Sequence, residues 1–228
     1  MAKRGIVYLV WGDSIKDALA RSIDSVRDLY PDMPIEVFPV DGAVGNLSSS
    51  KARMCELTPF DTTLFLDADT VMLGNVDFAF QKAEQFGLAC CICEAPWMRR
   101  YGDPAEAEMI EYNTGVIFFS KEARLVFDRW ASFSRDLPSR SRWRTLEDPL
   151  GYVRGLAFDD QAGFARAVAA AELNPFILPI NYNLRPYFHR SFFAPVKIWH
   201  DYSGVPAVVR DVSQKVERGE TPITYIRL

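Results

Sequence analysis

The sequence is poor in histidine and cysteine, and its cysteines are not spaced as a zinc site. Its 228 residues include two histidines and four cysteines. Cys90, Cys91 and Cys93 lie in one apolar stretch and Cys55 stands alone, whereas a zinc site needs paired Cys-x2-Cys units or a histidine close by. We therefore expect reduced thiols that pack as small apolar side chains, with no disulfide.

Long apolar runs are also absent. No stretch approaches the roughly 20 apolar residues that a membrane-spanning helix requires. Residues Met1 to Arg4 lead directly into a short apolar strand, without the pattern of a cleaved signal peptide. We therefore expect a cytoplasmic protein without a transmembrane segment.

The third absence is an excess of positive charge. The formal net charge is −4, and nucleic-acid surfaces normally carry a basic patch that neutralises phosphates. No nucleic-acid partner is therefore expected. A small anionic substrate is compatible with this charge, because a few local cations suffice to bind it.

What the sequence does contain is enough apolar material for one sizeable core. It is 49% hydrophobic and 25% charged, and it shows neither an internal repeat nor a linker rich enough to separate domains. We expect a single domain over residues 1–228. Residues 137–155 are basic, polar and poor in core residues, which predicts either a flexible solvated loop or a mobile flap over a ligand.

Apolar runs alternate with helical patterns along the chain, which opens with a βαβ unit. Strands are predicted at 5–10, 35–38, 62–71, 88–92 and 114–119, and helices at about 15–30, 48–57, 78–86, 121–133 and 159–171. This alternation predicts an α/β fold with a mostly parallel, Rossmann-like central sheet covered by helices on both faces. The last third, rich in proline and aromatic residues, is expected to be an irregular extension over the sheet edge.

The most informative motif is Asp67-Ala68-Asp69, within the apolar run that begins at Thr62. Open α/β sheets bind ligands at the carboxyl ends of their strands. In an extended segment alternate side chains share a face, so Asp67 and Asp69 can hold one hard divalent cation, with the small Ala68 leaving room beside them. The plainer interpretation is an Asp-rich turn after a strand, but the apolar run and three further motifs favour a metal site.

Those three motifs lie further along the chain. Asn113-Thr114-Gly115 brings a hydrogen-bonding amide and a glycine that allows close approach to the start of a strand, although an ordinary turn has the same composition. Asp160-Gln161 begins a helix, where an acidic residue is also a common cap. His200 follows an apolar run, where a neutral imidazole would complete a metal site, although lone histidines are usually structural.

Together and in this order, the motifs resemble the GT-A glycosyltransferases, in particular the glycogenin-like and lipopolysaccharide galactosyltransferase-like group that uses nucleotide sugars. The resemblance spans nearly the whole chain. It implies a metal-dependent transfer of a hexose from a nucleotide diphosphate donor, a UDP-sugar, to an acceptor that the sequence does not identify, with retention of configuration. It also implies that Asp67, Asp69 and His200 bind Mn2+ or Mg2+, which bridges the donor diphosphate.

The same resemblance assigns the donor contacts. It implies that Asp160 and Gln161 are the catalytic pair, which positions the sugar or stabilises an oxocarbenium-like state. The end of the first strand lies where the family holds the nucleotide base. The implied donor-binding residues are Val10, Trp11, Asp13, Arg53, Ala68, Asn113, Thr114 and Gly115.

The segment after His200 departs from that group. Its members commonly carry a lysine there that contacts the diphosphate, whereas residues 200–206 read His-Asp-Tyr-Ser-Gly-Val-Pro. Arg210 or the arginine-rich loop are the candidate replacements. If the reaction were inverting, a carboxylate base would be needed on the opposite face of the sugar, and Glu94 and Asp159 are the candidates for it.

Two other functions fit parts of the sequence. A haloacid-dehalogenase-type phosphatase would use Asp67 as the phosphoryl-accepting nucleophile and Asp69 as the acid/base. That motif normally opens the first strand of its domain, whereas a βαβ unit precedes it here, and His200 would have no role. A GT-A-like module that binds a nucleotide or a sugar without turnover is the second alternative, motivated by the missing lysine.

Overall fold

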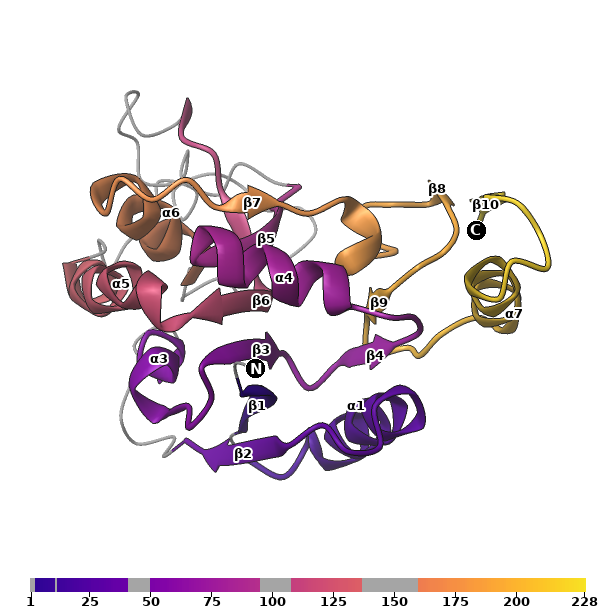
Figure 1. Cartoon of the computed structure of the whole chain (residues 1–228), viewed down its shortest axis with the longest axis horizontal. Coiled ribbons are helices and arrows are strands. Elements are labelled where there is room, and N and C mark those ends of the chain that lie inside the picture. The colour runs from indigo at the N-terminus through magenta and orange to yellow at the C-terminus, as the bar shows by residue number, and fades with distance from the viewer. Residues whose placement is uncertain (1–2, 11, 41–49, 95–107, 137–159) are drawn as a thin grey trace, which may run out of the picture.

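The computed structural model describes residues 3–10, 12–40, 50–94, 108–136 and 160–228. Its centre is a six-stranded sheet with the strand order β2-β1-β3-β6-β5-β7 (Figure 1). The strands are β1 (Arg4–Val10), β2 (Ile35–Pro39), β3 (Thr62–Leu66), β5 (Leu88–Ile92), β6 (Tyr112–Ser120) and β7 (Phe176–Ile177). The predicted α/β fold is confirmed.

The sheet is mostly parallel, with one reversed strand at its centre. β1 pairs in parallel with β2 and β3, and β5 pairs in parallel with β7. β6 lies between β3 and β5 and is antiparallel to both. The start of β6 therefore meets the carboxyl ends of β3 and β5 at one edge of the sheet. Every residue of β3 and β6 is buried, as expected for central strands covered on both faces.

Helices cover both faces of the sheet, because alternate residues of each strand point to opposite sides. Ile6 and Leu64 share one apolar cluster with α1 (Lys16–Leu29) and α4 (Asp77–Phe86). Val7 and Phe65 share the other cluster with three helices. These are α3 (Met54–Leu57), α5 (Arg124–Asp136), which follows a 3-10 turn η3 (Lys121–Ala123), and α6 (Asp160–Ala170).

The C-terminal third forms the predicted extension, built mainly of short elements. They are a 3-10 turn η6 (Ile180–Tyr182) and the strands β8 (Ser191–Phe193), β9 (Ile198–His200) and β10 (Tyr225–Arg227). The extension also contains one regular helix that the sequence analysis did not predict, α7 (Ala207–Glu217). Val209, Val212 and Val216 recur at helical spacing and pack in a third apolar cluster with β4 (Thr70–Met72), β8 and β9.

The pairing of β4 with β9 sets the geometry of the site. β4 follows β3 directly, and its antiparallel register places Thr70 opposite His200. The histidine at the end of β9 is thus carried to the carboxyl edge of β3, beside the two aspartates.

Other sequence predictions meet the structure as follows. All four cysteines are free and buried, as expected. Within the described part of the chain, no helix is both long enough and apolar enough to cross a membrane. The predicted loop at 137–155 lies outside the described residues.

Candidate metal and nucleotide-sugar site

Asp67 and Asp69 lie in the connection between β3 and β4. The backbone N–H of Thr70 donates to the carbonyl of Asp67 at 3.2 Å, and the Thr70 hydroxyl donates to the same carbonyl at 2.8 Å. The expectation that an extended backbone aligns the two carboxylates is therefore wrong. A hydrogen-bonded turn brings them to the same side, with the buried Ala68 at its tip.

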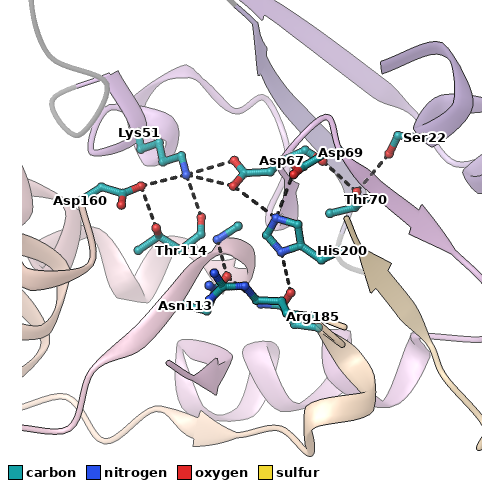
Figure 2. A network of polar contacts seen from close by, with 12 residues as sticks. Ser22, Lys51, Asp67, Asp69, Thr70, Asn113, Thr114, Asp160, Arg185 and His200 are labelled. Atoms are coloured by element: carbon teal, nitrogen blue, oxygen red, sulfur yellow. Dashed lines mark hydrogen bonds and ion pairs between the residues drawn. The ribbon is translucent and has the colours of Figure 1, made fainter. Parts of the chain in front are cut away.

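His200 faces both aspartates (Figure 2). Its Nε2 lies 3.3 Å from Asp69 Oδ1 and 3.9 Å from Asp67 Oδ2. One ligand atom from each of the three residues can be chosen so that all lie within 4.8 Å of one another. Two carboxylates and one imidazole form a donor set that suits Mn2+ or Mg2+, and three protein ligands leave coordination positions open for a substrate. These residues fit the implied cation.

A row of hydroxyl groups anchors the aspartate turn to α1. Tyr8 Oη lies 2.8 Å from Ser22 Oγ, which lies 3.1 Å from Thr70 Oγ1. The Thr70 hydroxyl donates its hydrogen to the Asp67 carbonyl, so it must accept the hydrogen bond from Ser22. The Ser22 hydroxyl therefore accepts from Tyr8. All three residues are buried, so this one-way row ties the turn to the core without help from solvent.

Gly115 provides the space that the site needs. Its carbonyl accepts a hydrogen bond from Asp67 N at 2.8 Å. A Cβ atom at this position would lie 2.3 Å from His200 Cε1 and 2.7 Å from Asp67 Oδ2. Only glycine lets the central strand β6 approach the imidazole and the carboxylate this closely.

Lys51 is a central residue of the site that the sequence analysis missed. Its ammonium group lies 3.0 Å from Asp67 Oδ1 and 2.9 Å from Asp160 Oδ2, and it donates to the Thr114 carbonyl at 3.3 Å (Figure 2). The resemblance pointed to Arg53, two residues later. The serine-rich sequence around Lys51 gives no sign of this role.

Charges around Lys51 decide the protonation states. Burial opposes its charge, but the carboxylates of Asp160 and Asp67 outweigh burial and raise the pKa of Lys51. Burial likewise opposes the charge of Asp160, yet Lys51 and the Thr114 hydroxyl lower the pKa of that carboxyl. Although it shares the same lysine, Asp67 has a raised pKa, because burial and the charges of Asp69 and Asp160 prevail over Lys51 and His200. Asp69 is also opposed by burial, but its hydrogen bond and charge interaction with His200 lower its pKa.

The catalytic pair predicted from the resemblance lies next to these groups. Asp160 begins α6 and accepts a hydrogen bond from the Thr114 hydroxyl at 2.7 Å. Gln161 Oε1 accepts from Asn113 Nδ2 at 3.1 Å. The structure thus brings the start of α6 and the first residues of β6 to the edge that carries the aspartates. Asn113 and Thr114 lie inside β6.

Other predicted donor contacts lie apart from this polar network. Arg53 pairs with Glu56 at 3.6 Å. It lines a cavity of about 280 Å³ near the ends of β1 and β2, together with Leu9, Phe38, Pro39, Val40, Ser50 and Leu57. Val10 ends β1, and its carbonyl accepts from Val40 N at 2.7 Å. Asp13 is exposed and pairs with Lys16 at 3.0 Å. Trp11 lies outside the described residues.

Of the two candidate bases for an inverting reaction, the structure describes Glu94 only. Glu94 has both oxygens engaged, one with Arg185 at 2.8 Å and the other with His189 at 3.0 Å. Each oxygen of Glu94 therefore already has a partner from the C-terminal third of the chain. Asp159 and the arginine-rich loop lie outside the described residues.

Comparison with known proteins identifies the fold. No known family profile and no curated protein matches the sequence. Among solved structures, the galactosyltransferase LgtC with donor and acceptor sugar analogs matches with a TM-score of 0.55 and 13% identity, over 86% of both chains. Mouse xyloside xylosyltransferase 1 matches with a TM-score of 0.54 and 14% identity, over 89% of this chain and 99% of that chain. The protein has the GT-A-like fold of glycosyltransferases, as predicted.

Proposed function

We propose that this protein is a metal-dependent glycosyltransferase that moves a hexose from a UDP-sugar to an acceptor, with retention of configuration. The observation that carries the proposal is the convergence of Asp67, Asp69 and His200 at the carboxyl edge of β3, in a glycosyltransferase fold. Breaking the bond between sugar and diphosphate leaves negative charge on the departing nucleotide. In this proposal a cation bound at the site would stabilise that charge.

The metal-binding residues would be Asp67, Asp69 and His200. A bound Mn2+ or Mg2+ supplies Lewis-acid stabilisation of the leaving diphosphate, worth several kcal/mol by the general magnitude of such effects. The turn that carries the aspartates is fixed by Thr70 and the hydroxyl row to α1, so the carboxylates are held in place before any ligand arrives.

The residues that would position the sugar lie at the start of α6. Asp160 and Gln161 lie beside Asn113 and Thr114, which form part of the same edge. Lys51 keeps Asp160 ionised at neutral pH, so that its carboxylate can accept sugar hydroxyls or stabilise positive charge at the anomeric carbon. Retention is proposed from the family resemblance, and Glu94, one of the two candidate bases for an inverting reaction, is paired with Arg185 and His189.

The nucleotide base is assigned to the ends of β1 and β2. The cavity lined by Arg53, Phe38 and Leu9 opens there, and the family resemblance assigns Val10, Trp11 and Asp13 to the base. Arg53 would contact the nucleoside from this cavity, whereas Lys51 forms ion pairs with Asp67 and Asp160.

A cation for the diphosphate is supplied by α1 in this proposal. Arg21 is exposed, and its guanidinium donates to the carbonyl of Tyr202 at 3.3 Å, in the segment where the family lysine is missing. Its neighbour Ser22 bonds to Thr70 of the aspartate turn. Within the described residues no carboxylate lies within ion-pair distance of Arg21, so its charge is free for a phosphate.

The deciding experiment measures the unfolding temperature with UDP, UDP-sugars and inorganic phosphate, each with and without Mn2+. A ligand that binds the folded state raises the unfolding temperature by mass action. Stabilisation by UDP that requires Mn2+, followed by release of UDP from a UDP-sugar, supports the transferase. Hydrolysis of an aryl phosphate would favour the phosphatase, which the solved glycosyltransferase structures do not support. Binding without turnover of any UDP-sugar would favour the inactive module.

A further inference from the structure

A row of amide side chains connects the start of α6 to the metal site. Asn113 Nδ2 donates to Gln161 Oε1 at 3.1 Å, and Asn183 Nδ2 donates to Asn113 Oδ1 at 2.7 Å. Asn183 Oδ1 then lies 2.8 Å from His200 Nδ1. Asn183 comes directly after η6, in a segment that the sequence analysis expected to be irregular, and it was not among the predicted site residues.

One backbone group fixes the direction of the whole row. The backbone N–H of Gly115 can only donate a hydrogen bond, and its nitrogen lies 2.9 Å from Asn113 Oδ1. The Asn113 atom at that place must therefore be its oxygen, since an amide nitrogen cannot accept. Asn183 must present its nitrogen to that oxygen, which leaves the Asn183 oxygen facing His200.

The consequence for His200 is a fixed proton position. Because Asn183 Oδ1 can only accept, Nδ1 of the imidazole must carry the hydrogen between them. In the neutral ring Nε2 then has a lone pair and no proton, and it points at Asp69 Oδ1 and Asp67 Oδ2. The space between these three atoms is filled either by a proton on Nε2, as in the hydrogen bond to Asp69, or by a divalent cation, which needs the Nε2 lone pair.

Burial makes this arrangement hard to exchange. Asn183 is 2% exposed and Asn113 is 5% exposed. Turning either amide over would set oxygen against oxygen or nitrogen against an N–H group, without water to replace the lost partner.

We propose that Asn183 is a positioning residue that holds His200 with Nδ1 protonated, so that Nε2 is the metal ligand. The row through Asn113 links this orientation to Gln161, and hence to the sugar-binding side of the site. This inference rests on the metal site of the proposed function.

The first test compares two asparagine variants. Asn183→Leu has a similar shape but no acceptor for Nδ1–H, and its Mn2+ affinity is expected to fall about 10- to 100-fold, as for other partners of metal-bound histidines. Asn181→Leu is the matched control. Asn181 lies in η6, two residues away, and donates to the Pro195 carbonyl at 3.0 Å instead. Its Mn2+ affinity should equal that of the wild type, measured by calorimetry on both folded variants.

The second test needs no substitution at Asn183 and stands if Asn183→Leu does not fold. The wild-type chain, labelled with 15N and loaded with 113Cd2+, is observed at its imidazole nitrogens by NMR. The two histidines are told apart with His189→Gln. We expect Cd–N coupling at Nε2 of His200 and a slowly exchanging proton on Nδ1.

The outcomes separate this inference from the proposed function. Coupling at Nδ1, or equal Mn2+ affinity in Asn183→Leu and the wild type, would overturn the role of Asn183 and leave the metal site standing. Failure of the wild type to bind Mn2+ and Cd2+ would overturn the metal site and the inference with it.

Discussion

Lys51 Nζ lies 2.9 Å from Asp160 Oδ2, although one residue precedes α3 and the other begins α6. The same ammonium group lies 3.0 Å from Asp67 Oδ1. The lysine side chain is 4% exposed. A single buried cation therefore holds together one proposed metal ligand and one proposed sugar-binding carboxylate before any substrate binds.

Replacement of Lys51 by methionine tests how much this cation stabilises the fold. Lys51→Met keeps the length of the side chain but leaves Asp67 and Asp160, whose side chains are 25% and 18% exposed, without their partner. We therefore expect a loss of up to about 3–5 kcal/mol in the free energy of unfolding. Lys121→Met is the control, because the Lys121–Asp61 pair is exposed and 3.4 Å long and should contribute little to stability. Urea unfolding measures both. Similar losses in the two variants would refute the structural role of Lys51.

Gly115→Ala tests the tight contact between β6 and His200. The added Cβ would lie 2.3 Å from His200 Cε1, so the imidazole must move, and we expect weaker Mn2+ binding and a loss of about 1–3 kcal/mol in stability. The control is a double-mutant cycle with His200→Ala, which removes the ring. In that background Gly115→Ala should destabilise less. An equal cost in both backgrounds would show that the ring is not the obstacle.

Arg21→Gln tests the proposed diphosphate cation. We expect the affinity for UDP in the presence of Mn2+ to fall by about 10-fold or more, because a hydrogen bond to a charged group contributes about 1.5–3 kcal/mol. Affinity for uridine, which lacks phosphate, should not change. Arg27→Gln alters an exposed arginine on the same helix and serves as control. If Arg21→Gln weakens uridine and UDP equally, the guanidinium does not act on the diphosphate.

The Arg4–Glu84 pair, whose partners are 80 residues apart in sequence, predicts a pH dependence of stability. Arg4 donates to both oxygens of Glu84, at 2.7 and 2.9 Å, and this hydrogen bonding lowers the pKa of Glu84. Its stabilisation is therefore present above the unfolded-state pKa of about 4.3 and is lost as the pH falls through the lower folded-state value.

Glu84→Gln measures that contribution. The variant should be less stable than the wild type by about 1 kcal/mol near neutral pH, and the difference should shrink at about pH 3. In an Arg4→Met background, Glu84→Gln should lose most of this pH-dependent effect. A difference that stays constant with pH would show that the charge of Glu84 does not cause it.

Local patterns were sufficient to predict most of the fold. The apolar run of β5 and the helical repeat of α4 are properties of neighbouring residues, and the structure confirms both elements. The reversed direction of β6 was not predicted, because strand direction depends on partners that lie far away in the sequence. The helix α7 was missed among prolines, although its valines had helical spacing.

The site was predicted where single motifs carry the chemistry and missed where distant residues meet. Asp67, Asp69 and His200 converge as the motifs suggested. Lys51 looks like a surface lysine in a serine-rich segment, since its burial depends on Asp67, 16 residues away, and on Asp160. Asn183 bonds to Asn113, 70 residues away, and nothing local distinguishes it from a turn asparagine.

Calorimetric titration of UDP into the wild type and into Asp69→Asn, with and without Mn2+, tests the central claim most directly. We predict that Mn2+ strengthens UDP binding to the wild type by about 10-fold or more, and that Asp69→Asn, which keeps the shape but weakens the ligand, removes this dependence. UDP affinity that is the same with and without Mn2+, or that still depends on Mn2+ in Asp69→Asn, would contradict the assignment of this edge of the sheet as a metal-bound diphosphate site.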